Sequence, residues 1–87
     1  MGPLVTETPK QYSPHEVVGD GVITSKVRAH LKKNPLTSGY KIDVETHNGV
    51  VQLDGFVESE AVQNEAVRVA REVEGVQQVR DLLDVRR

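Results

Sequence analysis

The chain has 87 residues, a formal net charge of −2 and 37% hydrophobic residues, which is the profile of one small domain with a polar surface. It contains no cysteine, which excludes disulfides, thiolate zinc sites and cysteine nucleophiles. No apolar run reaches the roughly 18–20 residues that cross a bilayer, and the chain contains no recognisable signal peptide.

Residues 1–19 are predicted to form a flexible N-terminal arm, and residues 20–86 are predicted to form the folded domain. Pro3, Pro9 and Pro14 recur in the arm among threonine and serine residues, without a helical or strand period. Proline-rich polar segments of this kind favour extended chain and bury little apolar surface.

The first helix is predicted to run from Asp20 to the residue before Pro35. Asp20 is predicted as its N-cap, because aspartate accepts hydrogen bonds from the free N–H groups of a first turn. Ile23, Val27 and Leu31 follow at four-residue spacing and predict one buried stripe. Pro35 ends the helix because proline cannot extend it and restricts the residue that precedes it.

A β-hairpin is the clearest local pattern in the chain. Residues 41–47 and 50–57 alternate polar and apolar side chains on either side of Asn48 and Gly49. Asn-Gly suits a two-residue type I′ turn, in which both central residues need positive φ. The register that follows brings the apolar residues of both strands to one face. Gly55 is predicted on that inner face, where its missing side chain lets a helix approach closely.

On the other face of the predicted hairpin, Asp43 lies opposite Asp54. Neighbouring carboxylates repel each other, so the sequence leaves three interpretations of this pair open. The two groups share a proton, they hold a cation, or they lie on the solvent face with Arg80 or Lys41 close enough to relieve the repulsion.

The second helix is predicted over residues 60–74, with Ser59 as N-cap and Gly75 at the left-handed C′ position. Residues 76–85 then predict a third strand. The order predicts an α+β fold, a two-layer αββαβ sandwich with two helices packed on one face of a three-stranded sheet.

The sequence predicts neither catalysis nor a metal or cofactor site. It has no GxSxG, P-loop, HExxH or GxGxxG motif. His15, His30 and His47 share no helical spacing, and none is a predicted metal ligand. Nucleic acid is also disfavoured: there is no GxxG loop, and aromatic residues are absent from the central strand positions that stack bases.

The charge is unevenly distributed along the chain. Residues 1–19 carry a net charge of −1. Residues 20–41 carry one acid against five cations, a net charge of +4, and residues 42–87 carry ten acids against five arginines, a net charge of −5. A basic segment in an otherwise acidic chain attracts phosphate groups. The alternative is a helix face that is simply exposed to solvent, because such a face has the same composition.

Four of these cations lie on the first predicted helix. A helical wheel places Lys26 and Lys33 on one edge of its exposed side and Arg28 and Lys32 on the other. Between the edges lies a weakly apolar strip of Val22, Ser25 and Ala29. This arrangement predicts docking on an anionic phospholipid surface without deep insertion.

The alternative hypothesis is a protein-interaction or scaffold module that uses the outer sheet face or a sheet edge. Phe56 and Leu82 are predicted to point outward, and an exposed apolar patch often marks an interface. The contact under this hypothesis is with a partner protein or a second copy of the chain, although the chain itself is expected to be a monomer.

From Asp20 to Val85 the sequence resembles the BON domain, the bacterial OsmY and nodulation module. The shared pattern is an aspartate that opens the first helix, an Asn-Gly hairpin with a G-x-V-x-L-x-G-x-V strand, an alanine-rich helix, a Val-x-Gly-Val step and a final strand. The pattern also includes apolar residues at four-residue spacing in the first helix. The matching residues are Asp20, Ile23, Val27, Leu31, Asn48, Gly49, Val51, Leu53, Gly55, Val57, Ala66, Ala70, Val73, Gly75, Val76, Val79, Leu83 and Val85. Asp81 stands where the family usually has asparagine.

The resemblance implies an αββαβ fold and a non-enzymatic role in phospholipid or envelope association. It implies a periplasmic or outer-membrane-associated location in bacteria and a role in envelope maintenance or the osmotic-stress response. It also implies that residues 1–19 are a spacer that follows a signal or membrane anchor.

Overall fold

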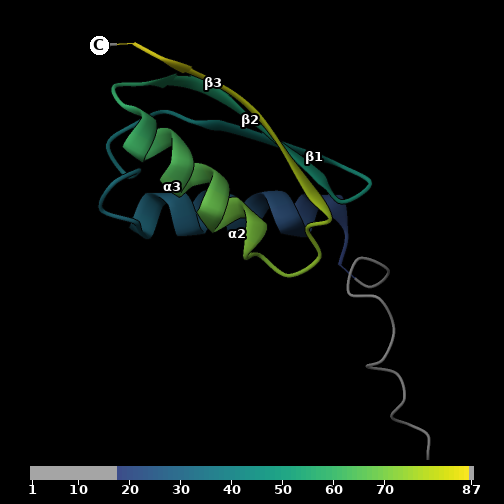
Figure 1. Ribbon diagram of the computed structural model, residues 1–87. Helices are drawn as coiled ribbons and strands as arrows, with labels where there is room; N and C mark the ends of the chain where they lie inside the picture. The colour runs from purple at the N-terminus through teal and green to yellow at the C-terminus, as the bar shows by residue number, and fades with distance from the viewer. Residues whose placement is uncertain (1–17, 87) are drawn as a thin grey trace, which may run out of the picture.

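The computed structural model describes residues 18–86, so the predicted arm lies outside the described residues except for its last two positions. The elements run in the order α2 (Asp20–Lys33), β1 (Asp43–His47), β2 (Val50–Val57), α3 (Glu60–Arg71) and β3 (Gln78–Val85). Both helices lie on the same side of the sheet, as Figure 1 shows. The predicted two-layer αββαβ sandwich is therefore confirmed.

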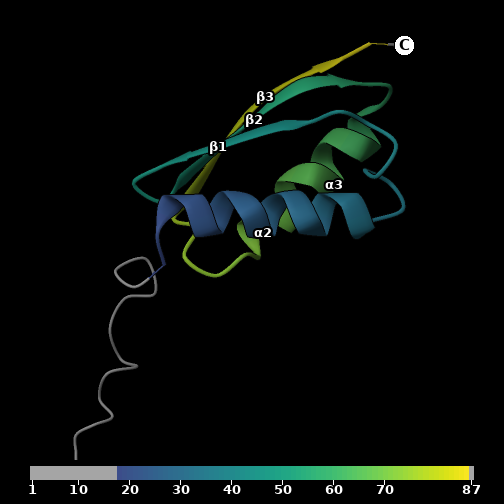
Figure 2. The same cartoon turned by 180° about the vertical axis from the view of Figure 1, so that it is seen from behind.

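The sheet has the strand order β1-β2-β3, so β2 is the central strand. β1 and β2 are antiparallel, and His47 pairs with Val50 as the Asn-Gly turn predicts. β3 is parallel to β2, and α3 forms the crossover between them (Figure 2). α2 packs mainly over β1, and α3 packs over β2 and β3.

The core is small and consists mostly of valine. Ile23, Val27 and Leu31 of α2 are buried, so the predicted stripe is confirmed. The other buried apolar residues are Val44, Val51, Leu53, Val57, Val62, Ala66, Val69, Ala70, Val73 and Leu83. One polar contact fixes α2 on β1, since the hydroxyls of Thr24 and Thr46 lie 2.8 Å apart.

Asp20 is not the N-cap of α2, contrary to the sequence prediction. Gly19 takes that position without a side-chain hydrogen bond, and Asp20 is the first helical residue. Its carboxylate instead accepts hydrogen bonds from the backbone N–H groups of Asn48, at 2.8 Å, and Gly49, at 3.0 Å. The free donors that this aspartate satisfies therefore belong to the hairpin turn and not to its own helix.

The hairpin turn has the predicted geometry and is held from two sides. Asn48 and Gly49 both have positive φ, 52° and 82°. The side-chain amide of Gln77 donates to the Asn48 carbonyl at 3.1 Å, and its backbone N–H donates to the Gly49 carbonyl at 2.8 Å. Asp20 and Gln77 thus bond both N–H groups and both carbonyls of the turn, which ties it to the starts of α2 and β3.

α3 ends at Arg71, three residues earlier than predicted, although Ser59 is its N-cap as expected and accepts from the Val62 N–H. Gly75 has the predicted positive φ of 95° but lies in the turn beyond the helix, so its assignment to the C′ position is wrong. The Val73 N–H bonds to the Ala70 carbonyl, which tightens the last turn and ends the helix early.

The sequence predicted that a helix approaches Gly55, but this prediction is wrong. Gly55 lies against backbone instead. A Cβ built there would be 2.7 Å from the carbonyl oxygen of Lys41, in the segment that leads into β1. Gly55 also has a φ of 141°, which side chains rarely allow. This approach occurs beyond the last β1–β2 pair, and β1 begins at Asp43 and not at Lys41.

Replacement of Gly55 tests this close approach. We expect Gly55→Ala to lower the free energy of unfolding by about 1–3 kcal/mol, because it combines unfavourable φ with a clash against backbone. Gly39→Ala is the matched control, since nothing lies within 4 Å of a Cβ at that position. Urea unfolding measures both variants, and equal stability of the two contradicts the explanation.

Replacement of Asp20 tests the hairpin contact. The two backbone hydrogen bonds from Asn48 and Gly49 lower the pKa of Asp20 below its usual 3.8. A carboxylate of lowered pKa stabilises the fold above its unfolded pKa, and that contribution is lost as the pH falls through the folded value. We therefore expect Asp20→Ala to be less stable than wild type at pH 7.

The difference between wild type and Asp20→Ala is expected to shrink as the pH falls below 3.8, the ordinary pKa of the carboxyl group. Urea unfolding at a series of pH values measures it. Glu58→Ala removes an exposed carboxylate without such bonds and serves as the control. A stability difference for Asp20→Ala that stays constant into acid contradicts a role for the charged carboxylate.

Candidate functional site

The four predicted lipid-binding cations are all exposed on α2. Their placement follows from the helical period, because the stripe of Ile23, Val27 and Leu31 faces the sheet and the four cations lie at positions turned to solvent. Lys26, Arg28, Lys32 and Lys33 form no ion pair with any residue in the range 18–86. Their charges are therefore not neutralised by direct contacts in the described part of the chain.

The predicted apolar strip exists as one continuous surface. Val22, Ser25 and Ala29 line a shallow hollow of α2 with two glycines, and Lys26 stands at its border. Val22 is the largest apolar side chain of the strip and is 49% exposed. The surface is weakly apolar, with a cation beside it and no large anchor residue.

One edge of α2 faces the start of β1. Arg28 and Lys32 line a hollow there with Tyr40 and the residues that lead into the strand. Arg28 also lines a second hollow that contains three acidic residues, Asp43, Glu45 and Asp54. The field of Arg28 is consequently opposed by nearby carboxylates, which was not evident from the helical wheel.

Asp43 and Asp54 pair directly across β1 and β2, as predicted, and both are exposed. Arg28 is the cation that lines the hollow shared by both carboxylates. The cations predicted to relieve their repulsion were Arg80 and Lys41. Lys41 lines a neighbouring hollow with Asp43 but not Asp54, and Arg80 lines neither hollow. Within residues 18–86 no group of three or more histidine, aspartate or glutamate side chains has an arrangement that could hold a metal ion, here or elsewhere.

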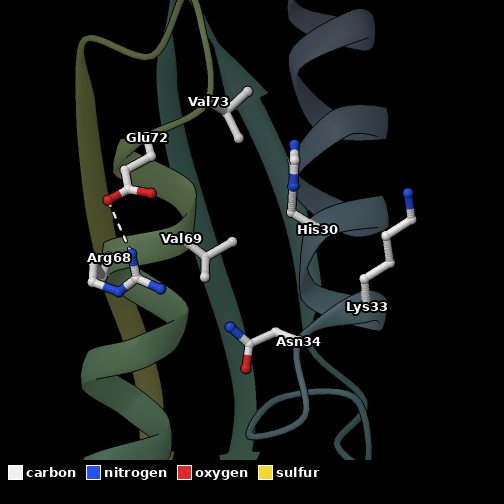
Figure 3. Close-up of a pocket in the computed structure, with 7 residues that line it drawn as sticks. All are labelled: His30, Lys33, Asn34, Arg68, Val69, Glu72 and Val73. Carbon is white, nitrogen blue, oxygen red and sulfur yellow. Dashed lines mark hydrogen bonds and ion pairs between the residues drawn. The ribbon is translucent and has the colours of Figure 1, made fainter.

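The other edge of α2 faces α3 across a hollow of about 310 Å³ (Figure 3). From α2 come His30, Lys33 and Asn34. From α3 and the turn after it come Arg68, Val69, Glu72 and Val73. Two of the lining valines belong to the core, so the hollow has an apolar floor and charged walls.

An ion-pair network on α3 forms one wall of this hollow. Arg68 bonds both oxygens of Glu65, from Nε to Oε1 at 3.0 Å and from Nη2 to Oε2 at 2.6 Å. Its Nη1 donates to Glu72 Oε2 at 2.9 Å. The Asn34 amide donates to Glu65 Oε2 at 2.6 Å, which connects α2 to the network.

This network shifts the pKa values of both Glu65 and Arg68. The Arg68 and Asn34 hydrogen bonds lower the pKa of Glu65 to about 2, and the Glu65 carboxylate raises the pKa of Arg68. Sequence reasoning missed the network, although the three- and four-residue spacings from Glu65 to Arg68 and from Arg68 to Glu72 are those of helical ion pairs. The bond from Asn34 depends on how the helices pack and leaves no local signal.

Neither helix of the described range is long and apolar enough to span a bilayer. The exposed face of α2 is the surface on which the predicted cations lie. The available chemistry of that surface is electrostatic and hydrogen-bonding, from lysine, arginine and amide groups.

Comparison with known proteins adds a family and one relative. The BON domain matches residues 19–87. The chain is 49% identical over 67 residues to osmotically-inducible protein Y of Escherichia coli (strain K12). The aligned region covers 77% of this chain and 33% of that protein, so the chain spans about a third of the length of its relative.

The Glu65 network predicts a specific loss of stability in acid. The pKa of Glu65 is lowered from 4.5 to about 2. The contribution of the Glu65 carboxylate to the free energy of unfolding is therefore present above pH 4.5 and is lost as the pH falls towards 2. Glu65→Gln is therefore expected to lose less stability than wild type over this interval, as measured by urea midpoints. Glu60→Gln, with an exposed carboxylate, is expected to behave as wild type; an unchanged acid transition in Glu65→Gln contradicts the assignment.

Proposed function

Because the chain belongs to the BON domain family, we propose that it is a non-enzymatic module that associates with membranes by binding anionic phospholipid headgroups on the exposed face of α2. The contact is assigned to Lys26, Arg28, Lys32 and Lys33. Such binding needs a charged surface and no reacting group, which agrees with the absence of catalytic motifs from the sequence.

The observation that carries this proposal is the set of four exposed α2 cations without ion-pair partners in the range 18–86. Asp20 is the only acidic residue of the helix, and it is bonded to the hairpin turn. Each basic side chain near an anionic bilayer contributes about 1 kcal/mol, reduced by salt. Four of them support weak, reversible association.

The two edges of α2 are expected to contribute unequally. Arg28 shares a hollow with three carboxylates, which repel an approaching phosphate. Lys26 lines the strip that contains Val22, Lys33 lies on the same edge of the helical wheel, and neither shares the hollow with these carboxylates. We therefore assign the larger share of binding to Lys26 and Lys33, with the strip in contact with the headgroup layer.

The proposed location is the bacterial envelope, in the periplasm or associated with the outer membrane. Its basis is family membership together with the Escherichia coli relative, whose name describes an osmotically inducible protein. We propose a role in envelope maintenance or the osmotic-stress response. The relative is about three times as long as the aligned region, so the proposal concerns this domain and not every activity of a longer protein.

The second candidate function is a protein-interaction module that uses the outer sheet face. Phe56 is 58% exposed and Leu82 is 45% exposed on that face. The Arg86 guanidinium lies 4.1 Å from the centroid of the Phe56 ring and forms an ion pair with Asp84. Apolar side chains beside charged groups are typical of protein contacts.

An amide-resolved NMR titration with bicelles tests the first candidate. Phosphatidylglycerol-containing bicelles are expected to shift residues 22–36, whereas zwitterionic bicelles are expected to cause much smaller shifts. Added salt weakens the binding because the attraction is electrostatic. Replacement of all four α2 cations by alanine is expected to abolish binding, and undiminished binding by this variant overturns the proposal.

A matched pair of double variants separates the site from total charge. Lys26→Gln/Lys33→Gln and Arg71→Gln/Arg80→Gln remove the same number of exposed positive charges from different elements. The first is expected to weaken vesicle binding much more than the second. Equal losses indicate attraction by net charge alone, and salt-independent shifts at Phe56 and Leu82 favour the second candidate.

A further inference from the structure

The hollow between α2 and α3 has two walls of different chemistry. His30 and Lys33 line the α2 side, although the Lys33 ammonium points away from α3, and the Arg68–Glu72 ion pair stands on the α3 side (Figure 3). Val69 and Val73 lie between them and are almost fully buried, so they close its floor. A ligand in this space faces the Glu72 carboxylate on one side, and the exposed Lys33 side chain has room to turn its ammonium towards it from the other.

The hollow is poorly suited to a simple anion. Arg68 already directs its Nε and both terminal nitrogens at the carboxylates of Glu65 and Glu72. The charges of Lys33 and Arg68 are balanced by those of Glu65 and Glu72. An anion therefore gains the attraction of Lys33 but meets the repulsion of Glu72, and the local balance favours a ligand that carries both signs.

Glu72 retains an oxygen that can accept from such a ligand. Only its Oε2 is bonded to Arg68, and its side chain is 66% exposed. Oε1 makes no hydrogen bond with any residue in the range 18–86. On the α2 side the Lys33 ammonium is free of ion pairs within the same range, so no bond is broken when this exposed side chain turns towards an anionic group in the hollow.

We propose that this hollow binds the phosphoethanolamine group, with its phosphate beside Lys33 and His30 and its primary ammonium on Glu72. This proposal rests on the proposed membrane association when the group belongs to a lipid. The same chemistry is present in soluble glycerophosphoethanolamine, so the hollow can be tested without a membrane.

The primary ammonium is the feature that selects this headgroup. It donates up to three hydrogen bonds and approaches a carboxylate closely. The trimethylammonium of phosphocholine donates none and holds its charge farther from the oxygen. The volume of about 310 Å³ holds the headgroup with room for water, so selection is by hydrogen bonding and not by size.

The position of the hollow is compatible with simultaneous contact of α2 with a bilayer. Lys33 belongs both to the α3-facing edge of α2 and to the wall of the hollow. The charged lining residues are exposed, although α2 and α3 bury their apolar stripes on the sheet. A membrane that docks on this edge therefore presents headgroups at the mouth of the hollow.

Soluble headgroups provide the first test. Glycerophosphoethanolamine, glycerophosphocholine and inorganic phosphate are titrated separately into the full chain and followed by NMR. Glycerophosphoethanolamine is expected to shift residues 30–34 and 68–73 and to bind more tightly than the other two. Equal binding of all three compounds, or no shift in either segment, overturns the proposal.

Two variants assign the groups. Glu72→Gln is expected to weaken glycerophosphoethanolamine binding about two- to five-fold, the range of an exposed ion pair, without weakening phosphate binding. Lys33→Gln is expected to weaken both. Glu74→Gln is the control, because it makes the same charge change outside the hollow. An effect of Glu74→Gln equal to that of Glu72→Gln overturns the assignment.

Vesicles provide the lipid arm. The phosphatidylglycerol fraction is held constant, and the remaining lipid is phosphatidylethanolamine or phosphatidylcholine. Wild type is expected to prefer the ethanolamine vesicles, and Glu72→Gln is expected to lose this preference while it still responds to phosphatidylglycerol.

The two proposals can fail separately. If the protein still binds phosphatidylglycerol but shows no preference for ethanolamine vesicles, the hollow is not a site for the lipid headgroup. The proposed membrane association by α2 is then unaffected. Loss of all vesicle binding with intact binding of soluble glycerophosphoethanolamine overturns membrane association and supports a site for the soluble compound.

Discussion

The fold depends on the hydrogen bonding of one two-residue turn. Positive φ at Asn48 and Gly49 reverses the chain between β1 and β2 and leaves two N–H groups and two carbonyls at its tip. Asp20 accepts from both donors, and Gln77 donates to both acceptors. These bonds join segments 28 and 29 residues apart in the chain, so one local turn aligns the starts of α2 and β3.

Alignment of α2 determines which of its side chains reach solvent. Its start is bonded to the hairpin, its middle contacts β1 through Thr24 and Thr46, and its C-cap residue Asn34 bonds to Glu65 of α3. These polar contacts supplement a core made largely of valine and alanine, which buries limited area per residue. The cations of α2 are thus displayed by a helix held at both ends.

Sequence patterns predicted the local features of the fold because their causes are local. Alternation and the Asn-Gly turn set the hairpin register, and four-residue spacing identified the buried stripe of α2. Two of the errors concern partners distant in sequence: the turn bound by Asp20 and the backbone that faces Gly55. A third error is local, since α3 ends at Arg71 and not at the residue before Gly75. The α2 cations were identifiable from the sequence, whereas the α2–α3 hollow requires two helices to pack and has no sequence signal.

The proposed lipid surface and the candidate protein surface lie on opposite sides of the molecule. The cations are on the helix layer, whereas Phe56 and Leu82 are on the outer face of the sheet. That outer face also carries four acidic residues, Asp43, Glu45, Asp54 and Asp84, of which Asp43 and Asp54 pair directly, against the basic residue Arg80 opposite Gln52. An anionic bilayer repels these carboxylates and attracts α2, so the field of the protein favours one docking orientation. In that orientation the outer sheet face points away from the membrane, and a protein partner can bind it while lipid occupies α2.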